Sequence, residues 1–386
     1  YQSPDTAVFS DASNLTLTWF VPAQAKNYYS EDGEFVLGYW WSDQPSVTLD
    51  SVSVKYSIGG RSAVSVPDTT EKTTVVQSEG DSDFRTASEI VSDIKVGWNL
   101  GNTLESYNTN KTGLNTETGW GNPKTTKEMI TAVKNAGFNA VRVPVTWGEH
   151  MDGDTIQSDW LDRVQEVVDY AYDQDMYVIL NMHHEEWHMP TADNEESAEK
   201  ILRALWAQIA DYFKDYDEKL IFEGMNEPRL KGTPMEWNGG NQEAREVINQ
   251  LNAAFVETVR ASGGNNEKRH LMIPTYAAST MDSVLNDFVI PNDDKVIVSV
   301  HAYLPYTFAL ADNASGTSEW SADNFADTKD IDSLIANLKK RYIDNGQAVI
   351  IGEYGTRNRS FNTEPRAECA RYYVSVSYTH LRAHET

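Results

Sequence analysis

Two glutamates stand at the ends of short apolar runs, where a carboxyl group could act on a substrate. Glu227 closes the run that begins at Leu220, and Glu353 closes the run 349–353. A short apolar run is typical of a strand buried on both faces, so each glutamate should stand where a loop begins. Two carboxyl groups that face one cleft suit hydrolysis of a glycosidic bond, since one protonates the leaving oxygen and the other attacks or activates water. A solvated strand end is the alternative for either glutamate alone.

Apolar runs recur along most of the chain and alternate with amphipathic stretches. Strands are predicted at 95–98, 140–143, 177–181, 220–223, 271–273, 296–300 and 348–351. Helices are predicted at 125–136, 159–174, 198–216, 243–262, 331–343 and 364–374, where apolar residues recur every three to four positions. Strands that alternate with helices form a parallel sheet, so the fold class is α/β. The pattern fits a (β/α)8 TIM barrel over residues 86–374 that lacks strand 8.

The eighth strand is expected after the helix at 364–374, but no strand pattern follows it. Residues 375–386 are too few for a helix end, a loop, a strand and a closing helix, so we interpret them as a non-native tail. A barrel of seven strands would leave two unpaired sheet edges and exposed apolar surface.

The first 66 residues alternate polar and apolar side chains, as β-strands do. Strands are predicted at 15–20, 34–40, 47–49 and 52–58, which indicates a small all-β sandwich whose N-terminal part is incomplete. Such a domain could be a carbohydrate-binding module, an Ig-like module or a structural spacer. Its aromatic residues could stack on sugars or form its core: Trp19, Tyr39, Trp40 and Trp41. Residues 67–85 are rich in Thr, Ser and Asp and are predicted to be a linker.

The composition excludes some partners. The formal net charge of −26 argues against binding to nucleic acid or to an anionic membrane surface, and no stretch is long and apolar enough to span a membrane. Cys369 is the only cysteine, so no intrachain disulfide can form. No signal peptide precedes Tyr1, so the signal of a secreted parent protein would lie upstream of it. We expect a secreted, extracellular monomer.

Four motifs in this order resemble glycoside hydrolase family 5, the cellulase family of the clan-A barrels. They lie at 97–103, 141–147, 226–228 and 352–355. The segment 119–123 and the double histidine at 183–184 resemble subfamily 4 of that family. The resemblance covers residues 88–374 and implies a TIM barrel with its active site at the carboxyl ends of the strands.

The resemblance implies a retaining mechanism, with Glu353 as the nucleophile and Glu227 as the acid/base. Arg142 would favour the charged form of Glu353, Tyr303 would donate a hydrogen bond to it, and Asn226 would hold the sugar 2-hydroxyl. Other substrate-binding or orienting residues are expected to be Asn99, His183, His184 and His301, with Trp147 and Trp187 lining flanking subsites beside Trp98, Trp120 and Trp237. The family also places a Trp after strand eight, and no residue here matches it.

The expected reaction is endo-hydrolysis of β-1,4-linked glucan polysaccharides such as cellulose, xyloglucan and mixed-linkage glucan, without a metal or an organic cofactor. One alternative is a truncated, inactive protein that still binds glycan. The other is a zinc metallopeptidase, because residues 184–188 formally match the H-E-x-x-H signature. That signature requires both histidines on one face of a helix, and here it leaves a strand directly and meets Pro190 soon afterwards.

Overall fold

The computed structural model describes residues 25–29, 35–39 and 84–381 of the chain, with side chains described for 84–377. Two compact units are distinguished, residues 1–81 and 82–386. In the first, β1 (Ala25–Tyr29) and β2 (Phe35–Tyr39) pair antiparallel. Strand β2 confirms the strand predicted at 34–40, whereas β1 was not predicted. The other predicted strands of this unit, its tryptophans and nearly all of the predicted linker lie outside the described residues.

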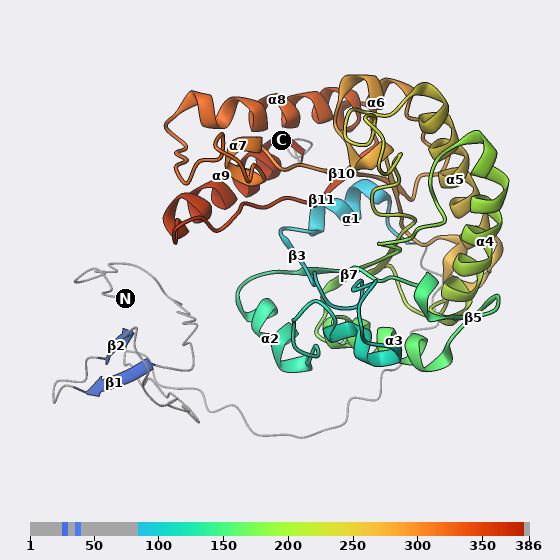
Figure 1. Ribbon diagram of the computed structural model, residues 1–386, viewed down its shortest axis with the longest axis horizontal. Coiled ribbons are helices and arrows are strands. Elements are labelled where there is room, and N and C mark those ends of the chain that lie inside the picture. The colour runs from blue at the N-terminus through green and yellow to red at the C-terminus, as the bar shows by residue number, and fades with distance from the viewer. Residues whose placement is uncertain (1–24, 30–34, 40–83, 382–386) are drawn as a thin grey trace. The chain divides into compact units, whose positions relative to one another are not determined.

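The second unit is built on one parallel sheet of seven strands, bent into a nearly closed barrel (Figure 1). Its order is β11-β10-β9-β8-β7-β4-β3. Every residue of the five inner strands is buried, because the barrel interior covers one face and the helices cover the other. The strands are β3 (Gly97–Asn99), β4 (Ala140–Val143), β7 (Tyr177–Asn181), β8 (Leu220–Glu223), β9 (Leu271–Pro274), β10 (Val296–His301) and β11 (Ala348–Glu353).

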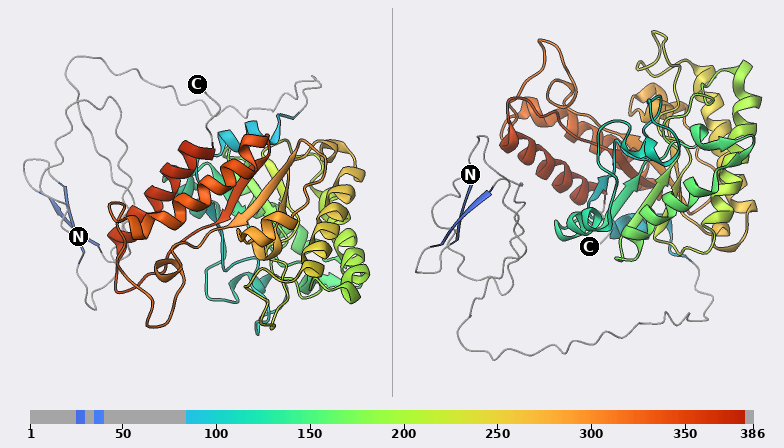
Figure 2. Two further views of the ribbon diagram at one scale, coloured as in Figure 1. Left: turned by 90° about the horizontal axis from the view of Figure 1, so that it is seen from above. Right: turned by 60° about the horizontal axis from the view of Figure 1, so that its bottom comes forward.

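Helices surround this sheet, and α8 and α9 lie side by side next to its β10–β11 edge (Figure 2). Side chains of Thr126 and Asn241 cap α2 and α5 by accepting from the backbone N–H groups of Met129 and Ala244. None of the described helices is long and apolar enough to cross a membrane. The helices are α1 (Ala87–Asp93), α2 (Lys127–Asn135), α3 (Ser158–Tyr172), α4 (Glu195–Tyr212), α5 (Gln242–Ala261), α6 (Asp282–Asp287), α7 (Tyr306–Ala309), α8 (Phe325–Arg341) and α9 (Thr363–Leu381).

Short elements connect these parts. The small hairpin of β5 (Met151–Asp152) and β6 (Thr155–Ile156) follows β4. The 3-10 helices are η1 (Gly113–Thr118), η2 (Gly148–His150), η3 (Ala192–Asn194), η4 (Gly264–Glu267), η5 (Tyr276–Ala278) and η6 (Ile343–Asn345).

The sequence prediction of seven parallel strands is confirmed, and β4, β7 and β8 have the predicted bounds. The main difference is α9. It was predicted to end at Val374, but it continues through the predicted tail to Leu381. Nothing in the fold tests whether residues 375–386 are native, so that interpretation stays a prediction.

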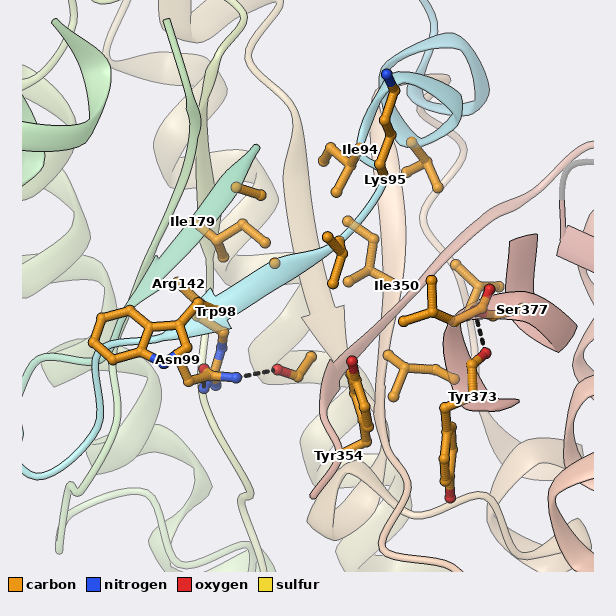
Figure 3. Close-up of a pocket in the computed structure, with 18 residues that line it drawn as sticks. Ile94, Lys95, Trp98, Asn99, Arg142, Ile179, Ile350, Tyr354, Tyr373 and Ser377 are labelled. Atoms are coloured by element: carbon orange, nitrogen blue, oxygen red, sulfur yellow. Dashed lines mark hydrogen bonds between the residues drawn. The ribbon is translucent and has the colours of Figure 1, made fainter. Parts of the chain in front are cut away.

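The barrel is interrupted between β3 and β11, which each pair with only one strand among the described residues. A cavity of about 140 Å³ lies there, and apolar side chains from both strands, α1 and α9 line it (Figure 3). One hydrogen bond joins the two edges: Asn99 Nδ2 donates to the Gly352 carbonyl at 2.9 Å. Ile350 and Ile351 are half-buried, unlike the apolar residues of the inner strands. The expected unpaired edges are therefore present.

Candidate active site

The carboxyl ends of the strands bring the two predicted catalytic glutamates together. Glu353 ends β11, and Glu227 lies in the loop that follows β8. One carboxylate oxygen of each glutamate and one ring nitrogen of His301 lie within 4.8 Å of one another. A register shift between Val300 and His301 sets His301 opposite Glu353 on the neighbouring strand. The prediction that strand ends gather these groups in one place is thus met by the geometry.

Both carboxylate oxygens of Glu353 are held by the protein. Arg142 Nη1 donates to Oε1 at 2.9 Å, and the Tyr303 hydroxyl donates to Oε2 at 2.6 Å. Burial by itself would raise the pKa of Glu353, but the positive charges of His301 and Arg142 and the Tyr303 hydrogen bond outweigh it. The net pKa lies well below the usual range of a glutamate, so Glu353 is ionised at neutral pH.

Arg142 is the centre of the network. It is buried on β4, and its Nη1 also donates to Asn99 Oδ1 at 3.0 Å, while its Nη2 donates to Asn226 Oδ1 at 2.7 Å. Its Nε donates to Glu223 at 2.6 Å. Asn99 Oδ1 and Asn226 Oδ1 therefore accept from Arg142, and Asn99 Nδ2 donates to the Gly352 carbonyl. These three side-chain atoms are already hydrogen-bonded within the protein. The predicted contacts of Asn99, Arg142 and Asn226 with substrate remain predictions.

Glu227 is held by two basic side chains. His301 Nδ1 lies 2.7 Å from Glu227 Oε1, and Arg229 Nη1 lies 3.7 Å from Oε2 and donates to the Glu227 carbonyl at 2.9 Å. Burial lowers the pKa of His301, but the charge of Glu353 and the hydrogen bond to Glu227 outweigh it, so the pKa is raised. The contact with His301 Nδ1 therefore holds the Glu227 carboxyl group close to Glu353.

The double histidine occupies two different environments. Burial lowers the pKa of His183 well below its ordinary value, and His183 Nδ1 lies 3.1 Å from Asn181 Nδ2. Burial and the charges of Lys231 and Arg229 lower the pKa of His184 to about 4. Both imidazoles are therefore neutral at pH 7. The His184 ring contacts Tyr107 and Trp120, with ring centroids 4.9 and 5.4 Å away, which gives a half-exposed aromatic cluster.

The two predicted flanking tryptophans behave differently. The expectation that Trp147 lines a subsite is wrong, because its ring is fully buried in the core and its Nε1 donates to the Asn181 carbonyl. Trp187 is partly exposed, and its Nε1 donates to Glu185 Oε2 at 2.8 Å. Glu185 also accepts from the N–H groups of Trp147 and Gly148. Burial raises the pKa of Glu185 to about 7, although these N–H donors lower it.

A metal centre finds little support among the described residues. Residues 183–190 form no helix, so His184 and His188 do not share the helical face that a zinc signature requires. The only group with metal-ligand spacing in the described part of the chain is Glu227, His301 and Glu353. The Arg142 guanidinium lies 2.9 Å from Glu353 there, and its positive charge opposes a bound cation.

Sequence reasoning missed four residues around the site. Glu223 and Ser299 lie beneath Arg142, Arg229 lies beside Glu227, and Tyr107 joins the aromatic cluster. A signal existed for Glu223, because a charged residue inside an apolar strand is costly unless it is paired. Arg229 directly follows the Asn-Glu-Pro motif. Nothing in the pattern singled out Ser299 or Tyr107.

A match to a protein-family model shows which family the chain belongs to. The model for "Cellulase (glycosyl hydrolase family 5)" matches residues 103–382, which is more than half of the chain. This chain belongs to glycosyl hydrolase family 5. The resemblance inferred from the motifs is thereby confirmed. Residues 1–55 of this family 5 chain match a second model, a domain of unknown function called DUF5620.

Known proteins similar to this family 5 chain are endoglucanases. Endoglucanase A of Clostridium longisporum is 50% identical over 304 residues, which cover 76% of this chain and 57% of that protein. The chain thus spans little more than half the length of that relative. Endoglucanase A of Ruminococcus albus is 49% identical over 298 residues, covering 75% of this chain and 80% of the relative.

Solved structures show the same relationship. A GH5-4 broad specificity endoglucanase from Clostridium longisporum is 48% identical, with a TM-score of 0.74 over 77% of this chain and 86% of the other. A family 5 lichenase from Caldicellulosiruptor sp. F32 is 42% identical, with a TM-score of 0.74 over 78% and 86% of the two chains. The nearly closed barrel described above is therefore the fold of this family.

Proposed function

We propose that this family 5 chain is a retaining endo-β-1,4-glucanase in which Glu353 is the nucleophile and Glu227 the acid/base. One observation supports this most: Arg142 and Tyr303 keep Glu353 ionised, while a carboxylate oxygen of Glu227 lies within 4.8 Å. Retaining glycosidases place their two carboxyl groups about 5–5.5 Å apart, whereas inverting enzymes need about 6.5–9.5 Å to admit a water.

In the first step, Glu353 attacks the anomeric carbon of the sugar and Glu227 gives its proton to the glycosidic oxygen. The bond to the leaving sugar breaks, and a glycosyl ester forms on Glu353. Arg142 and Tyr303 hold the attacking carboxylate in one orientation, so that little motion is needed to reach the transition state. His301 holds the Glu227 carboxyl group beside it.

In the second step, water hydrolyses the glycosyl ester. Glu227, now a carboxylate, removes a proton from the water as the water attacks the anomeric carbon, and Glu353 leaves as a carboxylate. The guanidinium of Arg142 and the hydroxyl of Tyr303 stabilise that departing charge. Two inversions at the same carbon return the product with the configuration of the substrate.

The relatives support a β-glucan as the substrate class. They are named endoglucanases and a lichenase, and one similar solved structure is described as xyloglucan-specific. The half-exposed rings of Tyr107, Trp120 and His184 offer apolar faces on which sugar rings can stack. We therefore include cellulose, xyloglucan and mixed-linkage glucan as substrates of this chain.

The test is hydrolysis of a polysaccharide panel by the whole chain, with and without chelator, followed by NMR of the first anomer released. We expect β-glucan cleavage that ignores chelator and releases the β-anomer. Release of the α-anomer would contradict retention. Glycan binding without turnover would favour the inactive binding protein. Loss of activity with chelator would reopen the metallopeptidase alternative, for which casein is the control substrate.

The remaining proposals concern the context of the enzyme. A polymeric substrate is too large to enter a cell, so we propose that the parent protein is secreted and acts as a monomer. A glycan-binding unit tethered to a glycosidase would raise the local concentration of substrate, so we propose glycan binding for residues 1–66. Cellulose pull-down of the whole chain, compared with a variant that lacks these residues, tests this last point.

A further inference from the structure

A third carboxylate lies beneath the two predicted catalytic glutamates. Glu223 ends β8, and its side chain is fully buried. Its Oε2 accepts from Arg142 Nε at 2.6 Å, and its Oε1 accepts from Ser299 Oγ at 2.7 Å. These three residues come from β8, β4 and β10, which are not adjacent to one another in the sheet. The contacts therefore cross the interior of the barrel rather than run along one strand pair.

These contacts determine how the Arg142 guanidinium is oriented. The group is planar and carries five N–H donors in a rigid arrangement. Because Glu223 binds Nε, the plane of the group is fixed and the two terminal nitrogens are left to donate to Glu353 and Asn226. Without this anchor, the guanidinium could rotate about the bonds of its side chain, and its distance to Glu353 would change.

The ion pairs of Arg142 favour the same role for Glu223. Arg142 forms ion pairs with two carboxylates, Glu223 at 2.6 Å and Glu353 at 2.9 Å. If Glu223 carried no charge, Arg142 would be left with one ion pair among the described residues, the pair with Glu353. Glu223 thus supplies a second, fully enclosed anion that holds the Arg142 cation in place.

The backbone leaves room for this anchor. A side-chain carbon at Gly352 would lie 3.3 Å from Ser299 Oγ and 3.3 Å from His301 Nε2. A glycine before Glu353 therefore lets β11 lie close to the serine that holds Glu223.

We infer that Glu223 is a positioning residue, which orients Arg142 and, through it, Glu353 and Asn226. Ser299 fixes the other oxygen of Glu223 and takes part in the same arrangement. Glu223 is enclosed by protein and does not touch the cleft, so it acts on the reaction only through Arg142. This inference rests on the proposed glucanase function for its kinetic consequences but not for its structural ones.

The test compares Glu223→Gln with wild type and with Glu117→Gln. Glu117 is as deeply buried and pairs with Arg163 at 2.7 Å, but it lies on η1, outside the catalytic network. We expect Glu223→Gln to lower kcat on a soluble β-glucan by about 10- to 100-fold, because a small misplacement of a reacting group has effects of that size. The KM and the Kd for a cello-oligosaccharide should stay within about threefold, since no substrate contact is lost.

A crystal structure of Glu223→Gln separates this inference from the proposed function. We expect Arg142 Nη1 to move out of hydrogen-bond distance of Glu353. An unmoved Arg142, or an unchanged kcat in an active enzyme, overturns the inference. If wild type cleaves no glucan, the proposed function fails, and the position of Arg142 alone decides the inference.

Ser299→Ala provides a second route if Glu223→Gln does not fold. It removes one hydrogen bond to Glu223 and leaves the ion pair intact, so kcat should fall by about two- to fivefold with KM unchanged. Glu117→Gln should leave kcat near that of wild type. An equal loss of kcat in Glu117→Gln and Glu223→Gln would show that both losses reflect general damage to the fold.

Discussion

Among the residues that the structure describes, two buried arginines have carboxylate partners, and they serve different ends. Arg163 on α3 binds both oxygens of Glu117, at 2.7 and 2.9 Å, and donates to the Thr125 carbonyl. Glu117 accepts in turn from the Thr125 N–H and is enclosed, while Arg163 Nη1 also pairs with Glu166, a half-exposed residue on the same helix. Arg142 instead divides its donors between Glu223 and Glu353, which end different strands of the barrel.

The difference between the clusters lies in what their carboxylates face. The side chain of Glu353 keeps 17% of its surface exposed and that of Glu227 16%, whereas Glu117 keeps 1%. The bidentate pair of Arg163 and Glu117 joins η1 to α3 inside the protein. Arg142 holds a partly exposed carboxylate, Glu353, close to Glu227, whereas the exposed partner of Arg163, Glu166, lies three residues further along the same helix. The same residue types therefore stabilise in one place and position in the other.

Replacement of Glu353 or Glu227, the two partly exposed carboxylates, should have the largest effect on activity. Glu353→Gln and Glu227→Gln should each lower turnover of β-glucan by at least about a thousandfold, because the first removes the nucleophile and the second the proton donor. Initial rates on a soluble glucan measure the loss, and circular dichroism checks that the barrel stays folded. Activity close to wild type in either variant would end the assignment of that glutamate.

Arginine-to-lysine replacements test the two clusters directly. A lysine carries a compact point charge and cannot satisfy Glu223, Glu353 and Asn226 at the same time, so Arg142→Lys should lower kcat by about a hundredfold. Arg163→Lys should leave kcat within about threefold of wild type and lower the Tm instead. Similar losses of kcat in both variants would show that the clusters do not differ in function.

The strands were the part of the fold that the sequence predicted best. β4, β7 and β8 have the predicted bounds, because each is buried on both faces and is therefore an uninterrupted apolar run. Helix ends were less predictable, since a polar turn at the surface looks the same just inside and just outside a helix. α8 begins at Phe325, six positions before the predicted start at Ile331, because most side chains of its first turns are exposed and show no apolar periodicity.

The orientation of side chains at the site was harder to predict from the sequence than the strands were. The motifs predicted Glu227 and Glu353 as site residues. They did not predict that Trp147 lies in the core while Trp187 is partly exposed. Both tryptophans follow strands, and the direction of a ring in a loop depends on contacts far away in the sequence. The charge of Glu223 within an apolar strand indicated a paired residue, but its partners come from β4 and β10 and could not be identified from the sequence.

Glu117→Gln should lower the free energy of unfolding by roughly 3 kcal/mol, because it leaves a buried guanidinium with fewer charged partners. Its kcat should remain near wild type. Urea denaturation followed by tryptophan fluorescence measures the first quantity, and glucan hydrolysis the second. Unchanged stability would mean that the Arg163–Glu117 ion pair contributes no more than a pair of uncharged side chains would. The proposed contrast between a stabilising Arg163 and a positioning Arg142 would then fail for Arg163.

Glu185 shows what burial does to a carboxyl group that has no arginine partner in the described part of the chain. Its pKa is raised from the ordinary 4.5 to about 7, so folding favours its protonated form. The stability that it contributes is complete below pH 4.5 and is lost as the pH rises through 7. Over that interval the loss is on the order of 3 kcal/mol, at about 1.4 kcal/mol per pKa unit. Glu353 has a lowered pKa, so its contribution has the opposite sign and is lost as the pH falls.

Glu185→Gln should remove this pH dependence, because an amide does not titrate between pH 5 and 8. The free energy of unfolding of wild type, measured in urea at several pH values, should fall more steeply with rising pH than that of the variant. Glu186→Gln is the matched control, since the Glu186 side chain is 68% exposed and its replacement should leave the slope unchanged. Parallel slopes for wild type and Glu185→Gln would mean that water or a cation reaches this carboxylate. Burial alone would then not distinguish it from the carboxylates that Arg142 and Arg163 hold.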